Sequence, residues 1–221
     1  MKIIAECGCN WRNFDDVWDM IIKAKEIGCW GVKFQLFTKK EAPNLPKHLY
    51  LTKERARILF EYGKGQGIEV FFTCMFPEAV DWCELIGVNY YKIRYADRNN
   101  KELQRKIVDT NKPFFMSFLP FGSGGVIWRK MIILNCIPEY PALLEKYTAW
   151  KDMLYTHGHG VSDHTSDLEL LKLTKNNKFV KLWDEEGYDY YFEKHVKLND
   201  DCLESAWSCT FEELEEVLKH E

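Results

Sequence analysis

The chain has 221 residues, of which 46% are hydrophobic and 15% aromatic, a globular composition that excludes disordered and fibrous proteins. The 34 acidic and 30 basic residues give a net charge of −4 with no basic tract, so neither nucleic acid nor an anionic membrane is an expected partner. No apolar run approaches the roughly 18 residues of a membrane span. The first residues also lack a signal-peptide core, so we expect a cytoplasmic protein whose eight cysteines are buried, reduced thiols.

Short β-rich runs alternate with helical patterns along the chain. The expected strands are 2–6, 31–35, 69–73, 90–94, 113–117, 131–136, 157–162 and 189–195. Apolar residues at helical spacing predict helices over 15–27, 52–64, 77–86 and 99–110. Capping boxes at Ser166–Glu169 and Thr210–Glu213 predict two further helix starts.

Repeated strand–helix alternation predicts parallel strands joined by crossover helices. Eight such units favour an α/β fold of the closed (β/α)8 TIM-barrel type, with a doubly wound open sheet as the alternative. The barrel should be compact, because 118–130 is too short and glycine-rich for a normal crossover helix after the fifth strand. The stretch 175–188 reads as extra sequence. No linker or repeat divides the chain, so we expect one domain over residues 1–221.

Polar residues follow the predicted strands at their C-terminal ends, where such barrels carry their active sites. Lys33 lies between Val32 and Phe34 in an apolar strand, where an ammonium group is costly unless it meets an anion. His164 and His195 end the last two strands, which are neighbours in a closed barrel. Their imidazoles could therefore bind one divalent cation, although spacing alone favours two unrelated rim histidines. A second histidine pair, at 157 and 159, is the weaker option.

Five short strings resemble, in chain order over roughly residues 3–214, the catalytic barrel of the sialic acid synthase family. This family comprises N-acetylneuraminate synthases and their legionaminate and pseudaminate relatives. The strings are Ile4-Ala5-Glu6-x-Gly8-x-Asn10, Val32-Lys33-Phe34-Gln35, Tyr91-Lys92-Ile93, Ser162-Asp163-His164-Thr165 and Glu193-Lys194-His195.

The resemblance implies a condensation of phosphoenolpyruvate with an N-acyl amino-sugar aldehyde, such as N-acetylmannosamine. The products would be a nonulosonic 2-keto acid and phosphate. A divalent metal would sit on His164 and His195 as a Lewis acid, with Mn²⁺ as the first choice and Mg²⁺, Co²⁺ or Zn²⁺ as alternatives.

The resemblance also implies roles for individual residues. Phosphoenolpyruvate would be held by residues matching Lys33, Gln35, Thr73, Lys92, Ser117 and Ser162. The sugar would meet Asn10, Tyr140 and Glu204, and the catalytic groups would be Glu6, Lys92, Asp97 and Glu193.

The chain departs from the family pattern at two places that matter. After the fourth strand the family's Gly-Ser-Gly-Glu is replaced by Arg94-Tyr95-Ala96-Asp97, and we expect Arg94 to take over as a phosphate ligand. The chain ends at Glu221, so we expect no C-terminal antifreeze-like domain. Family members pair as dimers with the help of that domain, which leaves a homodimer open here. Two alternatives remain: another metal-dependent barrel lyase or aldolase, and a non-catalytic binding barrel.

Overall fold

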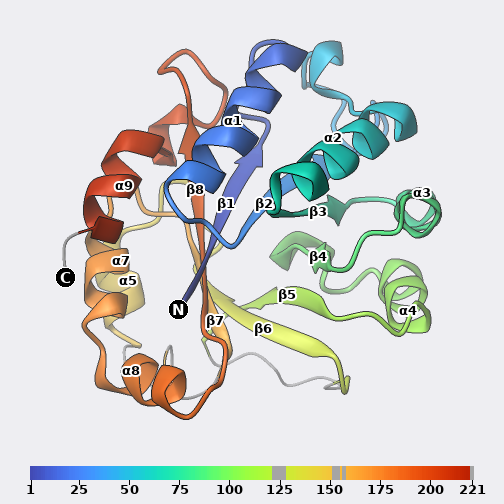
Figure 1. Ribbon diagram of the computed structural model, residues 1–221. Coiled ribbons are helices and arrows are strands. Elements are labelled where there is room, and N and C mark those ends of the chain that lie inside the picture. The colour runs from blue at the N-terminus through green and yellow to red at the C-terminus, as the bar shows by residue number, and fades with distance from the viewer. Residues whose placement is uncertain (121–127, 151–154, 156–157, 220–221) are drawn as a thin grey trace.

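A computed structural model describes residues 1–120, 128–150, 155 and 158–219, and it shows a closed barrel of parallel strands (Figure 1). Neighbouring strands along the chain are neighbours in the barrel, and β1 pairs with β8 from Lys2 to Glu6 to close it. The strands are β1 (Lys2–Gly8), β2 (Gly31–Leu36), β3 (Glu69–Cys74), β4 (Tyr91–Ile93), β5 (Phe114–Phe118), β6 (Met131–Cys136), β7 (Gly160–Asp163) and β8 (Tyr191–Lys197). The predicted (β/α)8 barrel is confirmed, and closure excludes the open sheet.

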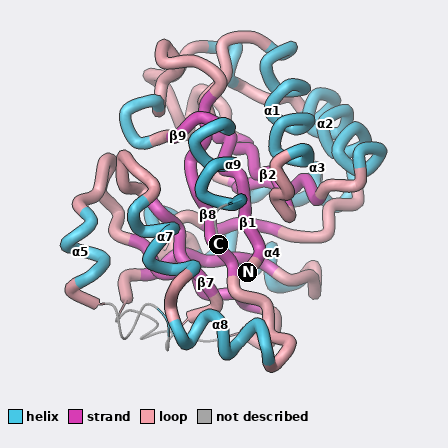
Figure 2. Tube along the Cα trace, turned by 60° about the vertical axis from the view of Figure 1, so that its left-hand side comes forward, coloured by secondary structure: helices cyan, strands magenta, loops and turns pink. Residues whose placement is uncertain are grey.

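Helices cover the outside of the barrel (Figure 2). They are α1 (Phe14–Glu26), α2 (Lys53–Gln66), α3 (Pro77–Ile86), α4 (Lys101–Asp109), α5 (Leu144–Thr148), α7 (Glu169–Lys175), α8 (Lys178–Glu185) and α9 (Phe211–Lys219). Three short 3-10 helices, η1 (Lys47–Leu49), η2 (Tyr95–Asp97) and η3 (Ser205–Trp207), and a two-residue strand, β9 (Cys209–Thr210), complete the elements. The described part of 118–130 contains no helix, and α8 occupies the predicted extra sequence.

Side-chain caps explain where several helices begin. The predicted capping box at α9 is confirmed, because the Glu213 amide donates to Thr210 Oγ1 at 3.1 Å and the Thr210 amide donates to Glu213 Oε2 at 2.8 Å. The box expected at Ser166 is wrong. There α7 begins only at Glu169, and Asp167 Oδ1 accepts from the Glu169 amide at 3.0 Å.

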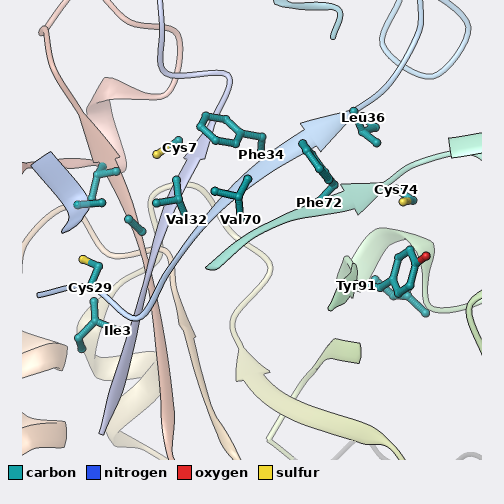
Figure 3. Close-up of a cluster of buried hydrophobic side chains, with 14 of the residues drawn as sticks. Ile3, Cys7, Cys29, Val32, Phe34, Leu36, Val70, Phe72, Cys74 and Tyr91 are labelled. Atoms are coloured by element: carbon teal, nitrogen blue, oxygen red, sulfur yellow. The ribbon is translucent and has the colours of Figure 1, made fainter. Parts of the chain in front are cut away.

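The core has two parts, because successive residues of each strand face opposite sides of the barrel wall. Outward-facing residues pack against the helices, and Figure 3 shows this layer over β1, β2 and β3 with Cys7, Val32, Phe34, Val70 and Phe72. Inward-facing residues form a separate cluster of Ile4, Phe71, Phe115, Leu134 and Tyr191 that fills the lower barrel. We call this inner cluster the aromatic floor.

All eight cysteines are buried free thiols, as predicted. The described helices include none with the length and apolar character that crossing a bilayer requires.

Candidate active site

Above the aromatic floor, the inward-facing positions of the strands become polar. On β8, Tyr191 belongs to the floor, and the next two inward positions are Glu193 and His195. The polar side chains surround a cavity of about 40 Å³ at the C-terminal end of the barrel, which we call the mouth. It is lined by Glu6, Lys33, Gln35, Lys92, Arg94, Tyr95, Ser117, Tyr140, Ser162, His164, Glu193 and His195. The structure thus brings together most of the residues that the strand ends predicted.

Two lysines and two carboxylates form a buried network in the mouth. Lys92 Nζ lies 3.0 and 3.1 Å from the two carboxylate oxygens of Glu193, and both side chains are at most 4% exposed. Ser162 Oγ donates to Glu193 Oε1 at 2.7 Å. Burial alone raises the pKa of Glu193, but the ammonium groups of Lys33 and Lys92 outweigh it and hold that pKa well below its usual range.

Lys33 completes the network from the neighbouring strand. Its ammonium forms an ion pair with Glu6, lies 3.8 Å from Glu193 Oε2, and donates to Thr73 Oγ1 at 3.0 Å. Gln35 Nε2 donates to Glu6 Oε1 at 3.2 Å and so helps to hold that carboxylate. Burial lowers the pKa of Lys33 to about 7 against the attraction of Glu193. The buried lysine that the sequence singled out therefore meets anions supplied by the barrel itself.

His164 and His195 lie side by side, with their ring centroids 5.5 Å apart. His164 Nδ1 is 2.7 Å from the Ile137 carbonyl oxygen. Because this oxygen can only accept a hydrogen bond, Nδ1 carries the proton and Nε2 carries the lone pair. His195 Nδ1 lies 3.3 Å from Glu204 Oε2, an arrangement that also favours a lone pair on Nε2. Burial and the neighbouring His195 lower the pKa of His164 to about 3, so this imidazole is neutral at physiological pH.

The two imidazoles fit the donor set of a divalent metal in part. In each ring one nitrogen lies against an oxygen acceptor, and metal-bound histidines are usually oriented by such a hydrogen bond from their other ring nitrogen. Within the described residues, however, no group of three or more His, Cys, Asp or Glu side chains is arranged around a common metal position. Any metal on His164 and His195 would complete its shell with water or substrate oxygens.

The three residues predicted to meet the sugar lie at different depths. Tyr140 is 52% exposed and stacks on His164 with centroids 4.2 Å apart. Glu204 contacts His195, and this hydrogen bond overcomes burial and lowers the pKa of Glu204. Asn10 is fully buried, and its amide groups bond to the Val196 carbonyl at 2.8 Å and to the segment that carries Glu204. Asn10 therefore positions this segment.

Arg94 and Asp97 pair with each other at the rim. Arg94 Nε and Nη2 donate to the two Asp97 oxygens at 2.6 and 3.2 Å. Arg94 lines the mouth and Asp97 holds its guanidinium, so the predicted catalytic carboxylate is engaged by an arginine in this structure. Beside them, the Arg98 guanidinium lies 3.8 Å from the ring centroid of Tyr95.

Two further supports of the site were not predicted from the sequence, although Asp163 and Lys194 of the second belong to the strings that carry the resemblance. The Tyr147 hydroxyl donates to the Ser162 carbonyl at 2.8 Å and accepts from the His164 amide at 3.2 Å, so it fixes the end of β7. On the outward side, Lys194 Nζ and Asp163 Oδ2 are 3.1 Å apart, and both side chains are fully buried. This second ion pair joins the ends of β7 and β8 beneath the two histidines.

Of the weaker histidine pair, the structure describes only His159, which does not line the mouth. His159 Nδ1 accepts from the Ile133 amide at 3.0 Å, and its pKa is lowered by burial. Residue 157 lies outside the described residues.

A family comparison bears on this arrangement directly. The NeuB family model matches residues 40–119. This segment belongs to the NeuB family. The match confirms the family that the motifs predicted, and it covers Thr73, Lys92, Arg94, Asp97 and Ser117 of the predicted site. No curated protein matches the sequence.

Solved structures have the same barrel as this chain. N-acetylneuraminic acid (sialic acid) synthetase from Leptospira borgpetersenii is 21% identical with a TM-score of 0.78, and the match covers 98% of this chain and 80% of that one. A spore coat polysaccharide biosynthesis protein from Bacillus subtilis is 20% identical with a TM-score of 0.73, covering 98% and 66%. A truncated 3-deoxy-D-arabino-heptulosonate 7-phosphate synthase from Thermotoga maritima is 13% identical with a TM-score of 0.66, covering 99% and 84%. At these identities the likeness establishes the fold.

Proposed function

We propose that this NeuB-family barrel is a metal-dependent synthase that condenses phosphoenolpyruvate with an N-acyl amino-sugar aldehyde. The observation that carries the proposal is the grouping of three cationic side chains, Lys33, Lys92 and Arg94, with two histidines around one buried cavity. A small, highly charged anion and a divalent cation are the ligands that such a set favours. The sialic acid synthetase with the same fold supports this choice of reaction.

The lysines must exchange partners when phosphoenolpyruvate binds. Its phosphate and carboxylate together carry about three negative charges at neutral pH. The mouth is only about 40 Å³ in volume, and Glu6 and Glu193 already pair with the two lysines. The ligand would therefore enter as the ammonium groups turn from these carboxylates to the phosphate and carboxylate of the substrate. Ser162 and Ser117, which also line the mouth, would add hydroxyl donors.

The reaction forms one carbon–carbon bond and one carbon–oxygen bond, the latter to water, and breaks the carbon–oxygen bond to phosphate. C3 of phosphoenolpyruvate attacks the aldehyde carbon, a water molecule adds to C2, and the tetrahedral intermediate expels phosphate. Glu6, which pairs with Lys33 in the free mouth, would accept a proton from the attacking water once released. Bound to His164 and His195, the metal would supply a Lewis acid for the aldehyde oxygen.

Phosphate release tests the function. The protein is mixed with phosphoenolpyruvate, Mn²⁺ and a panel of N-acetylhexosamines, and inorganic phosphate is measured. We expect phosphate with at least one sugar and none after Lys92→Met or His164→Asn. Lys64→Met, which removes an exposed lysine at the end of α2, serves as the matched control.

The same experiment separates the alternatives. Binding of phosphoenolpyruvate without phosphate release from any sugar would favour another barrel lyase or aldolase. Absence of both phosphoenolpyruvate and metal binding would favour a non-catalytic barrel and contradict the proposal.

A further inference from the structure

The indole nitrogen of Trp207 is a buried donor without an acceptor. Trp207 ends η3, and its Nε1 is closed off from solvent but forms no hydrogen bond with any part of the chain that the structure describes. The two other buried side-chain atoms without a hydrogen bond, Glu6 Oε2 and Asp163 Oδ2, each lie against a lysine ammonium. Only the Trp207 donor has no compensating partner among these three atoms. An uncompensated buried donor is rare in native proteins and points to a missing acceptor.

The segment that carries Trp207 is firmly held. Asn10 Nδ2 donates to Ser208 Oγ at 2.7 Å, and Asn10 Oδ1 accepts from the Glu204 amide at 2.9 Å. Ser208 Oγ in turn donates to the Glu204 carbonyl at 2.7 Å. Because hydrogen bonds fix the backbone on both sides of η3, the indole is held in place by a defined local structure.

Trp207 extends a wall of rings that begins at the two histidines. Its ring centroid lies 5.5 Å from that of Tyr140. Tyr140 in turn stacks on His164 at 4.2 Å and contacts His195 edge-on at 6.1 Å. Tyr140 thus lies between the histidines and Trp207, and its ring is half exposed.

We propose that Trp207 Nε1 donates to the amide carbonyl of an N-acyl aldehyde substrate, and so selects acylated amino sugars over plain sugars. This inference rests on the proposed function, which places the aldehyde end at His164 and His195. In an open-chain 2-acylamino sugar the acyl group is attached to the carbon next to the aldehyde. It would therefore extend along Tyr140 toward Trp207. An indole N–H donates only, so its partner must be an acceptor, and an amide carbonyl brings no competing donor of its own.

The test uses two unreactive sugars that differ in the acyl group. N-acetylmannosaminitol and mannitol both lack the aldehyde, and only the first has an amide carbonyl. Each is titrated into the ¹⁵N-labelled full chain with phosphoenolpyruvate and diamagnetic Mg²⁺. The Trp207 indole resonance is the one missing from Trp207→Phe or, should that variant not fold, the one in through-space contact with the Tyr140 ring.

We expect this resonance to move downfield with N-acetylmannosaminitol and to stay in place with mannitol. Trp207→Phe keeps an aromatic ring but removes the donor. It should weaken binding of N-acetylmannosaminitol about tenfold, leaving phosphoenolpyruvate affinity unchanged.

Three results would overturn the assignment: a resonance that does not move at saturation, an equal loss of affinity for both sugars in the variant, or no binding of N-acetylmannosaminitol at all. Phosphate release from phosphoenolpyruvate is followed separately. If the Trp207 resonance moves but no phosphate is released, the proposed reaction is rejected and the Trp207 assignment stands. If phosphate is released but the resonance does not move, the reaction stands and the Trp207 assignment is rejected.

Discussion

Removing both members of the Lys92–Glu193 pair should cost less stability than the two single removals added together. In Lys92→Met, the Glu193 carboxylate loses two hydrogen bonds of 3.0 and 3.1 Å in a site where it is almost fully buried. It keeps only Ser162 and the more distant Lys33 ammonium at 3.8 Å. Breaking a buried pair in this way costs about 3–5 kcal/mol, because an under-compensated charge stays behind. Glu193→Gln should cost a similar amount, since it strands the Lys92 ammonium.

The double variant Lys92→Met/Glu193→Gln has no stranded charge, and the new amide oxygen still accepts from Ser162. Its loss of stability should therefore be smaller than the sum of the single losses by about 2 kcal/mol or more. Urea unfolding followed by circular dichroism measures all four proteins. The exposed pair Lys172–Glu169, at 2.7 Å, is the control and should couple by less than about 1 kcal/mol. Additive losses at Lys92 and Glu193 would refute the reasoning.

Three further outcomes follow from the mouth. The pKa of His164 is about 3 in the folded protein and about 6.5 in the unfolded chain, so the unfolded chain takes up a proton first as the pH falls. The metal-free protein should therefore lose about 2 kcal/mol of stability between pH 7 and pH 5. Urea unfolding across this range should show a shallower slope for His164→Asn, and equal slopes would contradict the assignment. Gly8 has φ +37°, and a Cβ there would lie 2.7 Å from Glu6 Oε1 and 2.8 Å from Glu204 Oε2. Gly8→Ala should therefore lower both the melting temperature and phosphoenolpyruvate affinity, and a variant unchanged in both would show that the mouth tolerates a methyl group. Arg94→Leu should weaken phosphoenolpyruvate binding about tenfold in calorimetry, and unchanged affinity would remove Arg94 from the anion site.

The sequence was sufficient to predict the barrel and the position of the charged side chains at the strand ends. The period of two in the strands places Lys33 and Lys92 on the inner wall, and strand ends were predicted to within three residues. The partner of Lys33 was not predicted, because Glu6 and Lys33 become neighbours only through the β1–β2 register. The role of Tyr147 depends on contacts with two segments distant in sequence, and no local pattern reveals such contacts.

The residues that depart from the family pattern also make contacts that the sequence did not predict. The sequence predicts Arg94 as a phosphate ligand and Asp97 as a catalytic group, and their bidentate contact appears only once η2 is folded. Trp207 follows no strand and matches no motif, so only the orphaned nitrogen in the folded chain draws attention to it. Local sequence patterns predict the helices and strands and which of their faces are buried. Contacts between side chains of different elements can be identified only in the folded structure.

The aromatic floor also constrains the kinetics of any reaction in this barrel. Because those five side chains fill the opposite end, a molecule would reach Lys33 and Lys92 from the mouth, where Tyr140 and the two histidines are among the lining residues. A reactant seated beside Tyr140 would obstruct that route. If the lysines bind phosphoenolpyruvate as proposed, we expect it to load before the sugar, and initial-rate patterns should then be those of a sequential, compulsory-order mechanism.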